Sequence, residues 1–584
     1  MSLRPLRPSP AVHWAVLACL LLALLVGAAT FDRRTWPSLV GDEATYLMQA
    51  ESLAWDFDLA YSRQDYDRFV SHWGQPPEGL ILQKGRDRST LVYGKPMFYA
   101  AWAAPFVRLS PTRGPFVANA LLLALAALVA ARALRPTVGP AAPTWVALFV
   151  FASVTFAYVF WAHIDLFLMC VTALGLALAF SGRGEGEAAE PARRLVVRWL
   201  AVGLLLAVVA FSRPLYLPLF LPAALAVPRG RRLPALAGLA GGALVLVILA
   251  VGVHESLVGT WTSYGAERRS FNSTVGFPDV EFPEAGWDRM IAEWGNASWL
   301  KSRDLSAYFG GDAHLWTWDT IYFLAGRSVG VLPYFLPLVL GLLGRPRGWA
   351  RWALLLAVGL TAAGFFIVRP FNFYGGGGAL ANRYFLPVYP ALWFLPSRPV
   401  RGLWLALVGA AAAPFLWPVW VAPRSYPLDA RGVFRYVSPA ARALLPFETT
   451  QNHLKPAGPR ADVSHGGLWV KFLDPAVRAT PDGATLLLDG TGRGELLVGD
   501  DRPLGALDLV IEAAALPVEV GGGRVVAEAP DRPGWERLTV ELDGPRAVHP
   551  MWWTAEDFYL YTLTLESKEH LDRTFAFRLS RAER

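Results

Sequence analysis

Long apolar runs alternate with short polar turns from residue 12 to residue 421. A helix that crosses a bilayer needs about 20 largely apolar residues, and about eleven runs approach that length. The pattern therefore predicts a polytopic α-helical membrane protein with about 11 transmembrane helices. The runs lie near 12–30, 115–131, 144–161, 166–180, 195–211, 215–227, 233–253, 321–343, 352–368, 384–395 and 403–421. The shorter apolar run 98–109 contains Pro105, so it predicts an interfacial helix rather than a span.

The pattern changes after the last apolar run. Residues 423–461 are rich in proline and predict a linker. Beyond it, short runs such as 484–488 and 558–565 are rich in β-forming residues, alternate in part, and are separated by Gly, Pro and Asp. Such runs are typical of a β-sandwich. The chain thus divides into a transmembrane domain (1–422), a linker (423–461) and a soluble β-sandwich domain (462–584).

Composition and charge agree with a membrane protein. Only 17% of the residues are charged and 54% are hydrophobic, whereas a soluble domain has about 25% charged residues. The formal net charge of +7 comes largely from arginines in short loops, which indicates membrane topology and not a surface for nucleic acid. One alternate set of loops carries Arg132 and Arg135; Arg183, Arg193, Arg194 and Arg198; Arg229, Arg231 and Arg232; Arg345, Arg347 and Arg351; and Arg398 and Arg401.

These arginines fall on the same side of the predicted membrane as Arg4 and Arg7. The positive-inside rule then predicts a multi-pass protein of the cell membrane with a cytoplasmic N-terminus. The opposite, external side receives the loops 31–98 and 254–320, several short turns and the extracytoplasmic C-terminal domain. Charges in those external turns are not required by the rule, so they are the first candidates for chemistry.

Two adjacent carboxylates, Asp42 and Glu43, open the first long external loop. Carboxylates are costly to place near hydrocarbon, so acids at a bilayer surface often mark a functional site. One interpretation is a catalytic base beside the membrane. The alternative is structural: Asp42 caps an amphipathic helix over 44–55 and the acids favour its positive end.

Further along the same side lie a lysine and a His-Ile-Asp turn. Lys95 precedes the interfacial segment, where it either binds a lipid phosphate or extends its ammonium to the headgroup layer. His163 and Asp165 stand at the outer end of two runs. With Asp42 or Glu43 they could share a divalent ion, although a polar turn accounts for them equally, and Asp165 is the better candidate for an active-site acid.

Two external arginines complete the set of candidates. Arg213 lies between two apolar runs, and Arg383 follows a stretch with four consecutive glycines, 375–378. Guanidinium groups suit bidentate phosphate binding, and glycines let backbone amides approach an anion closely. The alternatives are an arginine that reaches the interface and a loop without a ligand.

Four short segments, taken in order, resemble the membrane glycosyltransferases of the C superfamily, which include protein O-mannosyltransferases and lipid A aminoarabinose transferases. The resemblance covers about residues 12–421. Ala44 and Met97 stand where the family has prolines, which leaves the acceptor class open, and the C-terminal β domain does not match the aminoarabinose transferases. The segments are Gly41-Asp42-Glu43-Ala44-Thr45-Tyr46-Leu47, Gly94-Lys95-Pro96-Met97-Phe98-Tyr99, Ile164-Asp165-Leu166-Phe167-Leu168 and Asn382-Arg383-Tyr384-Phe385-Leu386-Pro387.

The resemblance implies an enzyme that uses a polyprenyl-phosphate sugar donor on the external face. Asp42 would activate the acceptor, Glu43 would assist it, and Asp165 would support the site or a metal. Lys95 and Arg383 would hold the lipid phosphate, and charge placement adds Arg213.

The expected reaction is a single displacement with inversion onto a hydroxyl or amine of a glycan, lipid or protein. No cofactor is certain. A divalent ion such as Mg²⁺ or Mn²⁺ would find its ligands among Asp42, Glu43, His163 and Asp165.

Two other functions fit parts of the sequence. A transporter or flippase of a lipid-linked sugar would use the same cations without catalysis, and broken helices or charges in the middle of spans would favour it. A wall-binding scaffold would use the β domain, yet so many spans exceed what an anchor needs. Membrane lipids are expected partners in each case, and nucleic acid in none.

Overall fold

The fold is taken from a computed structural model of the 584-residue chain. The structure describes residues 9–36, 39, 41–181, 191–262, 268–273, 276–280, 313–376, 378–429, 432–451, 462–465, 467–481, 483–489, 493–545, 547–550, 557–567 and 573–582. Part of the predicted external loop 254–320 lies outside these residues, as does part of the predicted linker.

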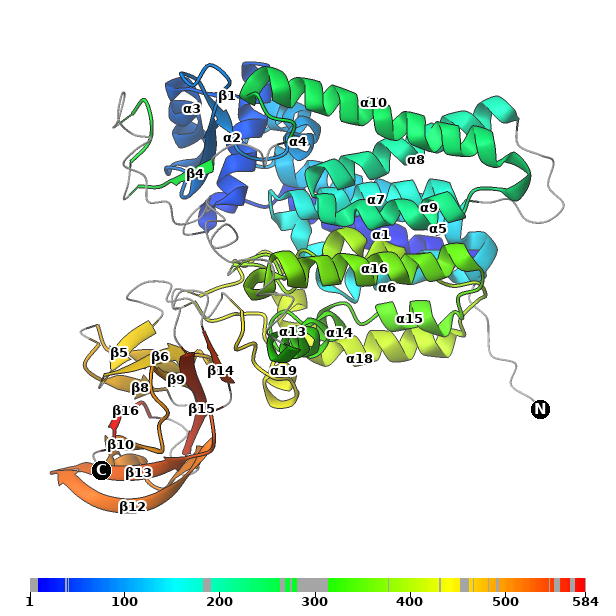
Figure 1. Cartoon of the computed structure of the whole chain (residues 1–584). Coiled ribbons are helices and arrows are strands. Elements are labelled where there is room, and N and C mark those ends of the chain that lie inside the picture. The colour runs from blue at the N-terminus through cyan, green and yellow to red at the C-terminus, as the bar shows by residue number, and fades with distance from the viewer. Residues whose placement is uncertain are drawn as a thin grey trace, which may run out of the picture.

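Within the described residues, six helical segments are long and apolar enough to cross a membrane. One of them consists of two helices, α5 (Gly114–Val138) and α6 (Ala142–Phe151), which a 3-10 turn joins. The long helices run side by side in Figure 1. The prediction of a polytopic membrane protein is therefore confirmed. The other five segments are α1 (Pro10–Ala29), α8 (Ala192–Ser212), α10 (Arg232–Val258), α16 (Trp349–Val368) and α18 (Gly402–Val421).

The predicted count of about 11 helices is not confirmed, because several apolar runs are broken. The run 321–343 becomes three helices, and the run 384–395 becomes a 3-10 turn and one short helix. The run 215–227 is also divided, and α7 (Ile164–Phe180), with 17 residues, is short. The pieces are α13 (Ala313–Ala325), α14 (Val331–Tyr334), α15 (Leu338–Leu343), η7 (Leu386–Val388), α17 (Pro390–Trp393), η4 (Pro214–Leu219) and α9 (Phe220–Leu225).

Prolines explain most of these breaks. A proline lacks the backbone N–H and its ring clashes with the preceding turn, so it ends or kinks a helix. Pro337 lies between α14 and α15, and Pro387 and Pro390 fall in the run after Arg383. Hydrophobicity over a window does not register these residues as breaks, because the run remains apolar. The error in the predicted count therefore has a local cause.

The first long loop folds into a small unit at one end of the long helices (Figure 1). Three helices, α2 (Asp42–Trp55), α3 (Arg63–Trp73) and α4 (Phe98–Leu109), accompany a four-stranded antiparallel sheet in the order β1-β3-β2-β4. With 12 residues, α4 is too short to span a membrane, as the sequence predicted. The sheet was not predicted. Its strands are β1 (Ala60–Tyr61), β2 (Leu80–Lys84), β3 (Leu91–Tyr93) and β4 (Arg268–Phe271).

The C-terminal region is β-rich, as predicted, and forms two sheets. Their orders are β12-β13-β10-β16-β8-β7 and β11-β15-β9-β6-β5, with β14 paired to β15. Val470 and Leu496 from one sheet share a hydrophobic core with Leu509 and Phe577 from the other, as in a sandwich. The strands are β5 (Asp462–His465), β6 (Leu468–Phe472), β7 (Val477–Ala479), β8 (Leu486–Leu488), β9 (Arg493–Asp500), β10 (Ala506–Glu512), β11 (Val518–Gly521), β12 (Gly523–Arg532), β13 (Trp535–Leu542), β14 (Ala547–Pro550), β15 (Asp557–Ser567) and β16 (Phe575–Arg581).

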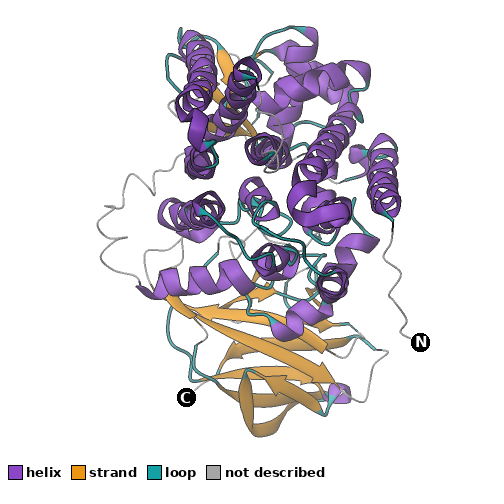
Figure 2. Cartoon of the chain, turned by 90° about the vertical axis from the view of Figure 1, so that its right-hand side faces the viewer, coloured by secondary structure: helices purple, strands orange, loops and turns teal. Residues whose placement is uncertain are grey.

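The sandwich packs directly against the helical part (Figure 2). Arg327 lies between α13 and α14, and its guanidinium is 2.5 Å from Glu495 on β9. A second ion pair joins Arg442, in α19 (Pro439–Leu444), to Asp474. Phe447 adds an apolar contact to the same junction. Over its described part, the segment predicted as a linker is thus a packed connection.

Candidate functional site

Six of the seven residues singled out from the sequence meet in one cluster. They are held at the ends of helices: Asp42 begins α2, His163 and Asp165 cap and begin α7, and Arg213 follows α8. Because their ring and charged groups lie within contact distance, the cluster joins segments that are far apart in the chain. Lys95 precedes α4 and Arg383 precedes η7, and these two complete the set.

Asp42 is the centre of this cluster. Its Oδ1 lies 2.5 Å from Lys95 Nζ, and its Oδ2 accepts hydrogen bonds from His163 Nε2 at 3.0 Å and from Arg383 Nη2 at 3.3 Å. The side chain remains 19% exposed. The structural alternative, in which Asp42 caps α2 through its side chain, is wrong, because the helix already begins at Asp42 and the carboxylate points to the cluster. Lys95 likewise pairs with an acid instead of extending to the headgroup layer.

His163 links the two acids of the cluster. Its Nδ1 lies 2.7 Å from Asp165 Oδ2, while its Nε2 reaches Asp42. Asp165 is fully buried and forms an ion pair with Arg213. Sequence analysis placed His163 below Asp165 in importance, yet the imidazole connects both carboxylates and also contacts Arg383.

Tyr384 is a neighbour of the cluster that the sequence analysis did not single out. The guanidinium of Arg213 lies 4.5 Å from the centre of its ring, and that of Arg383 lies 5.5 Å away. Cations over an aromatic face are stabilised by the ring quadrupole. Tyr384 therefore holds the two arginines on one surface, and its place directly after Arg383 was the signal available in the sequence.

Glu43 does not join the cluster. Its carboxylate is buried and pairs with Arg33, with Nη2 to Oε2 at 2.5 Å, and it accepts a hydrogen bond from the Ala162 amide at 3.2 Å. Arg33 is fully buried and lies 3.9 Å from the centre of the Trp36 ring. Sequence analysis missed Arg33 because an arginine after the first span resembles an ordinary interfacial charge. The contacts give Glu43 a structural partner next to His163, and its predicted catalytic role stays a prediction.

The close charges change the acidity of the two residues at the centre. Burial alone would raise the pKa of Asp42, but Lys95, the hydrogen bond from His163 and Arg383 together hold it well below its ordinary value. Burial lowers the pKa of Lys95 to about 8, against the attraction of Asp42. Asp42 is therefore ionised at neutral pH, and Lys95 loses its proton within a range accessible to experiment.

The four residues proposed as metal ligands do not form one coordination shell. Asp42 faces Lys95 and Arg383, Asp165 faces Arg213, and Glu43 faces Arg33. Among the residues that the structure describes, no group of three or more His, Cys, Asp or Glu side chains is placed to hold a metal ion. The geometry thus does not fit a divalent ion at these positions, and a metal requirement remains an untested expectation.

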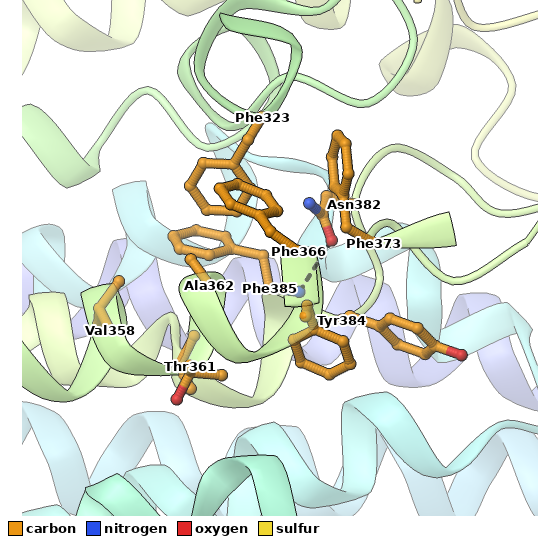
Figure 3. Close-up of a pocket in the computed structure, with 11 residues that line it drawn as sticks. Phe323, Val358, Thr361, Ala362, Phe366, Phe373, Asn382, Tyr384 and Phe385 are labelled. Carbon is orange, nitrogen blue, oxygen red and sulfur yellow. Dashed lines mark hydrogen bonds between the residues drawn. The ribbon is translucent and has the colours of Figure 1, made fainter. Parts of the chain in front are cut away.

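A narrow apolar hollow adjoins the cluster on the side of Tyr384 (Figure 3). Four phenylalanine rings gather there, from α13, α16 and the segment 373–385, and Asn382 Oδ1 accepts a hydrogen bond from the Phe385 amide at 3.0 Å. The segment that carries Arg383 is therefore fixed on one side by aromatic packing. The rings are those of Phe323, Phe366, Phe373 and Phe385.

The sequence matches no known protein family and no curated protein. Two solved structures resemble the fold: ArnT from Cupriavidus metallidurans bound to undecaprenyl phosphate (TM-score 0.36, 18% identity) and the same protein in the apo state (TM-score 0.34, 17% identity). Each match covers 71% of this chain and 62% of the ArnT chain, so the chain corresponds to less than two thirds of ArnT.

ArnT is a lipid A aminoarabinose transferase, one of the groups that the four sequence segments resemble. The resemblance drawn from those segments thus agrees with the structural neighbours. At TM-scores this low, the similarity supports no statement about activity or about individual residues, so the function has to be argued from the cluster itself.

Proposed function

We propose that this protein transfers a sugar from a polyprenyl-phosphate donor to a hydroxyl or amine acceptor on the external face of the cell membrane. The observation that carries the proposal is the position of Asp42 between Lys95 and Arg383. One carboxylate lies beside two cations in a polar cluster at the end of membrane helices. Such a site offers a base for an acceptor and positive charge for a phosphate.

The chemistry of the donor fits this division of roles. A phosphate leaves the anomeric carbon as a stable anion, so the leaving group needs cations and no protonating acid, unlike the sugar leaving group of a glycosidase. The acceptor needs one base to take its proton as the new bond forms. A single displacement of this kind inverts the anomeric centre.

The charges in the cluster leave room for an anion. Lys95, Arg213 and Arg383 supply three positive charges, whereas Asp42 and Asp165 supply two negative charges. A lipid phosphate that attracts Lys95 and Arg383 would withdraw them from Asp42. Because those cations hold the pKa of Asp42 down, their withdrawal would raise it and make Asp42 a stronger base once the donor is bound.

The other residues would support these groups. Asp165 holds Arg213 toward the cluster, and His163 orients the Asp42 carboxylate through its hydrogen bond. Glu43 would act indirectly, because it fixes Arg33 and the Ala162 amide next to His163. A metal ion is not needed for any of these steps.

The test compares a deletion strain carrying the wild-type gene with one carrying Asp42→Asn. Mass analysis of cell-envelope glycans, lipids and proteins should reveal a sugar that is lost on deletion, restored by the wild type and not restored by Asp42→Asn. Equal expression of both forms in the membrane is the control. Full restoration by Asp42→Asn would refute the role of Asp42 as base.

The broken helices favour one second function, a transporter or flippase of a lipid-linked sugar. Discontinuous helices are common at the binding sites of transporters, and here η7 and α17 follow Arg383 directly. Purified protein in liposomes distinguishes the two functions. Movement of a fluorescent polyprenyl-phosphate sugar between leaflets without sugar transfer would favour the transporter, and transfer that depends on Asp42 would favour the enzyme.

A further inference from the structure

The hydroxyl of Tyr436 contacts the segment that carries Arg383. Tyr436 lies in the connection between α18 and the sandwich, and its side chain is buried. Its oxygen accepts a hydrogen bond from the Ala381 amide at 3.0 Å and donates toward the carbonyls of Ser328 at 2.9 Å and Ala379 at 3.1 Å. Burial raises the pKa of Tyr436 well above its ordinary value, so the hydroxyl keeps the proton that it donates.

Ala381 adopts a backbone conformation that needs such support. Its φ is +55°, in the left-handed region that residues with a Cβ rarely occupy. Two residues later, the Arg383 amide donates to the Tyr374 carbonyl at 3.0 Å. The hydrogen bond from Ala381 to Tyr436 thus stabilises the strained turn that directly precedes Arg383.

The position of Arg383 depends on this turn. Its Nη2 lies 3.3 Å from Asp42 Oδ2 and its Nε 3.9 Å from Asp165 Oδ2. Distances at the limit of an ion pair are sensitive to small movements of the backbone. A turn that relaxed toward an ordinary backbone conformation would carry the guanidinium away from both acids.

We propose that Tyr436 is a positioning residue that sets the place of Arg383 in the site. The inference rests on the proposed function, in which Arg383 holds the donor phosphate. It gives the segment between the membrane helices and the sandwich a part in donor binding, although Tyr436 itself touches none of the charged groups.

The sandwich fixes the second partner of Tyr436. Ser328, whose carbonyl accepts from Tyr436, follows Arg327, and Arg327 pairs with Glu495 on β9. Arg327 also donates to the carbonyls of Arg442 and Leu445 in the same connection. The tyrosine hydroxyl therefore joins the turn before Arg383 to backbone that is anchored on the sandwich.

The experiment measures binding of undecaprenyl phosphate to the full chain in lipid nanodiscs. Tyr436→Phe removes one hydroxyl, and Tyr322→Phe is the matched control, because Tyr322 is equally buried and its hydroxyl lies 2.9 Å from Thr449 Oγ1 in the same connection, away from Arg383. One lost hydrogen bond should weaken binding by about five- to tenfold in Tyr436→Phe. Tyr322→Phe should bind like the wild type, with similar thermal unfolding of both variants.

A double variant tests whether the effect passes through Arg383. In an Arg383→Gln background, Tyr436→Phe should weaken binding no further, because the group that it positions is gone. An equal further loss in that background would overturn the inference, as would wild-type binding by Tyr436→Phe.

The proposed function can fail separately. If the wild type binds no undecaprenyl phosphate, that function is refuted, and cryo-electron microscopy of Tyr436→Phe still decides the positioning role. Displacement of the Arg383 guanidinium from Asp42 would support the role, and an unchanged position would refute it.

Discussion

Lys95 Nζ lies 2.5 Å from Asp42 Oδ1, so the first acid of the long loop is neutralised by the lysine that precedes α4. Both groups are needed for the proposed reaction, but in this arrangement each limits the other. The lysine makes Asp42 a weak base, and Asp42 occupies the cation that a phosphate requires. Arrival of the donor would exchange this contact for one between lysine and phosphate.

The affinity for a lipid phosphate should depend on pH through Lys95. The pKa of this group is lowered to about 8, so the ammonium is present below that pH and is lost above it. Binding of undecaprenyl phosphate should therefore be constant from about pH 7 to 8 and weaken by up to about tenfold per pH unit above it. Asp42 stays ionised throughout, because its pKa is lowered.

Lys95→Arg is the control for that pH profile. A guanidinium keeps its proton at all accessible pH values, so this variant should bind weakly or well but without the decline above pH 8. The same decline in Lys95→Arg would assign the titration to another group.

Asp42→Asn should reduce sugar transfer by about 100-fold or more, which is the usual contribution of a general base. Binding of the lipid phosphate should be retained or improved, because Lys95 and Arg383 lose a competing carboxylate. Turnover and affinity are measured on the same purified protein. Asp32→Asn is the matched control, since Asp32 lies in the same loop and pairs only with exposed Arg34, and a large loss of transfer there would point to a general effect on the loop.

Glu43→Gln should act mainly on stability. The change leaves Arg33, which is fully buried, without its carboxylate, and removal of one partner of a buried ion pair costs about 3–5 kcal/mol. Thermal unfolding in detergent measures the loss. The double variant Arg33→Met, Glu43→Leu should recover most of it, because no buried charge remains. Normal stability combined with lost transfer in Glu43→Gln would instead make Glu43 catalytic.

Gly375→Ala should weaken donor binding through Arg383. A Cβ at Gly375 would lie 2.3 Å from Arg383 Cγ, so the arginine has to move. Gly376→Ala is the matched control: its φ of +116° is as strained as the +109° of Gly375, but its Cβ would lie at an ordinary 3.8 Å from Arg383 Nη2. Equal loss of binding in both variants would show that backbone strain, and not the contact with Arg383, is responsible.

Sequence patterns predicted the members of the cluster better than the helices that hold them. Alternation of arginine-rich loops placed Asp42, Lys95, Asp165, Arg213 and Arg383 on one side of the membrane, and the structure brings these residues together. That success depends on charge, because each unneeded charge at a span end requires a partner. The roles of these residues remain predictions.

Other features had no signal in a single sequence. The pairing of Arg33 with Glu43 is decided by packing of Trp36, and not by any local pattern. The sheet of the first loop is completed by β4, which follows α10, so no run in the loop itself reveals it. The contact of Tyr436 with Ala381 is likewise set by the arrangement of distant segments.

Four of the six membrane-length segments, α1, α10, α16 and α18, have only 28% of their most apolar window buried within the protein, against 56% for the other two. On such helices most positions face hydrocarbon, where leucine, valine, alanine and phenylalanine satisfy the surroundings equally well. Exchange among them leaves the fold intact while it erases sequence identity. Relatives of this chain should therefore be sought by the order and spacing of a few polar residues at helix ends, since the helices themselves retain almost no record of common ancestry.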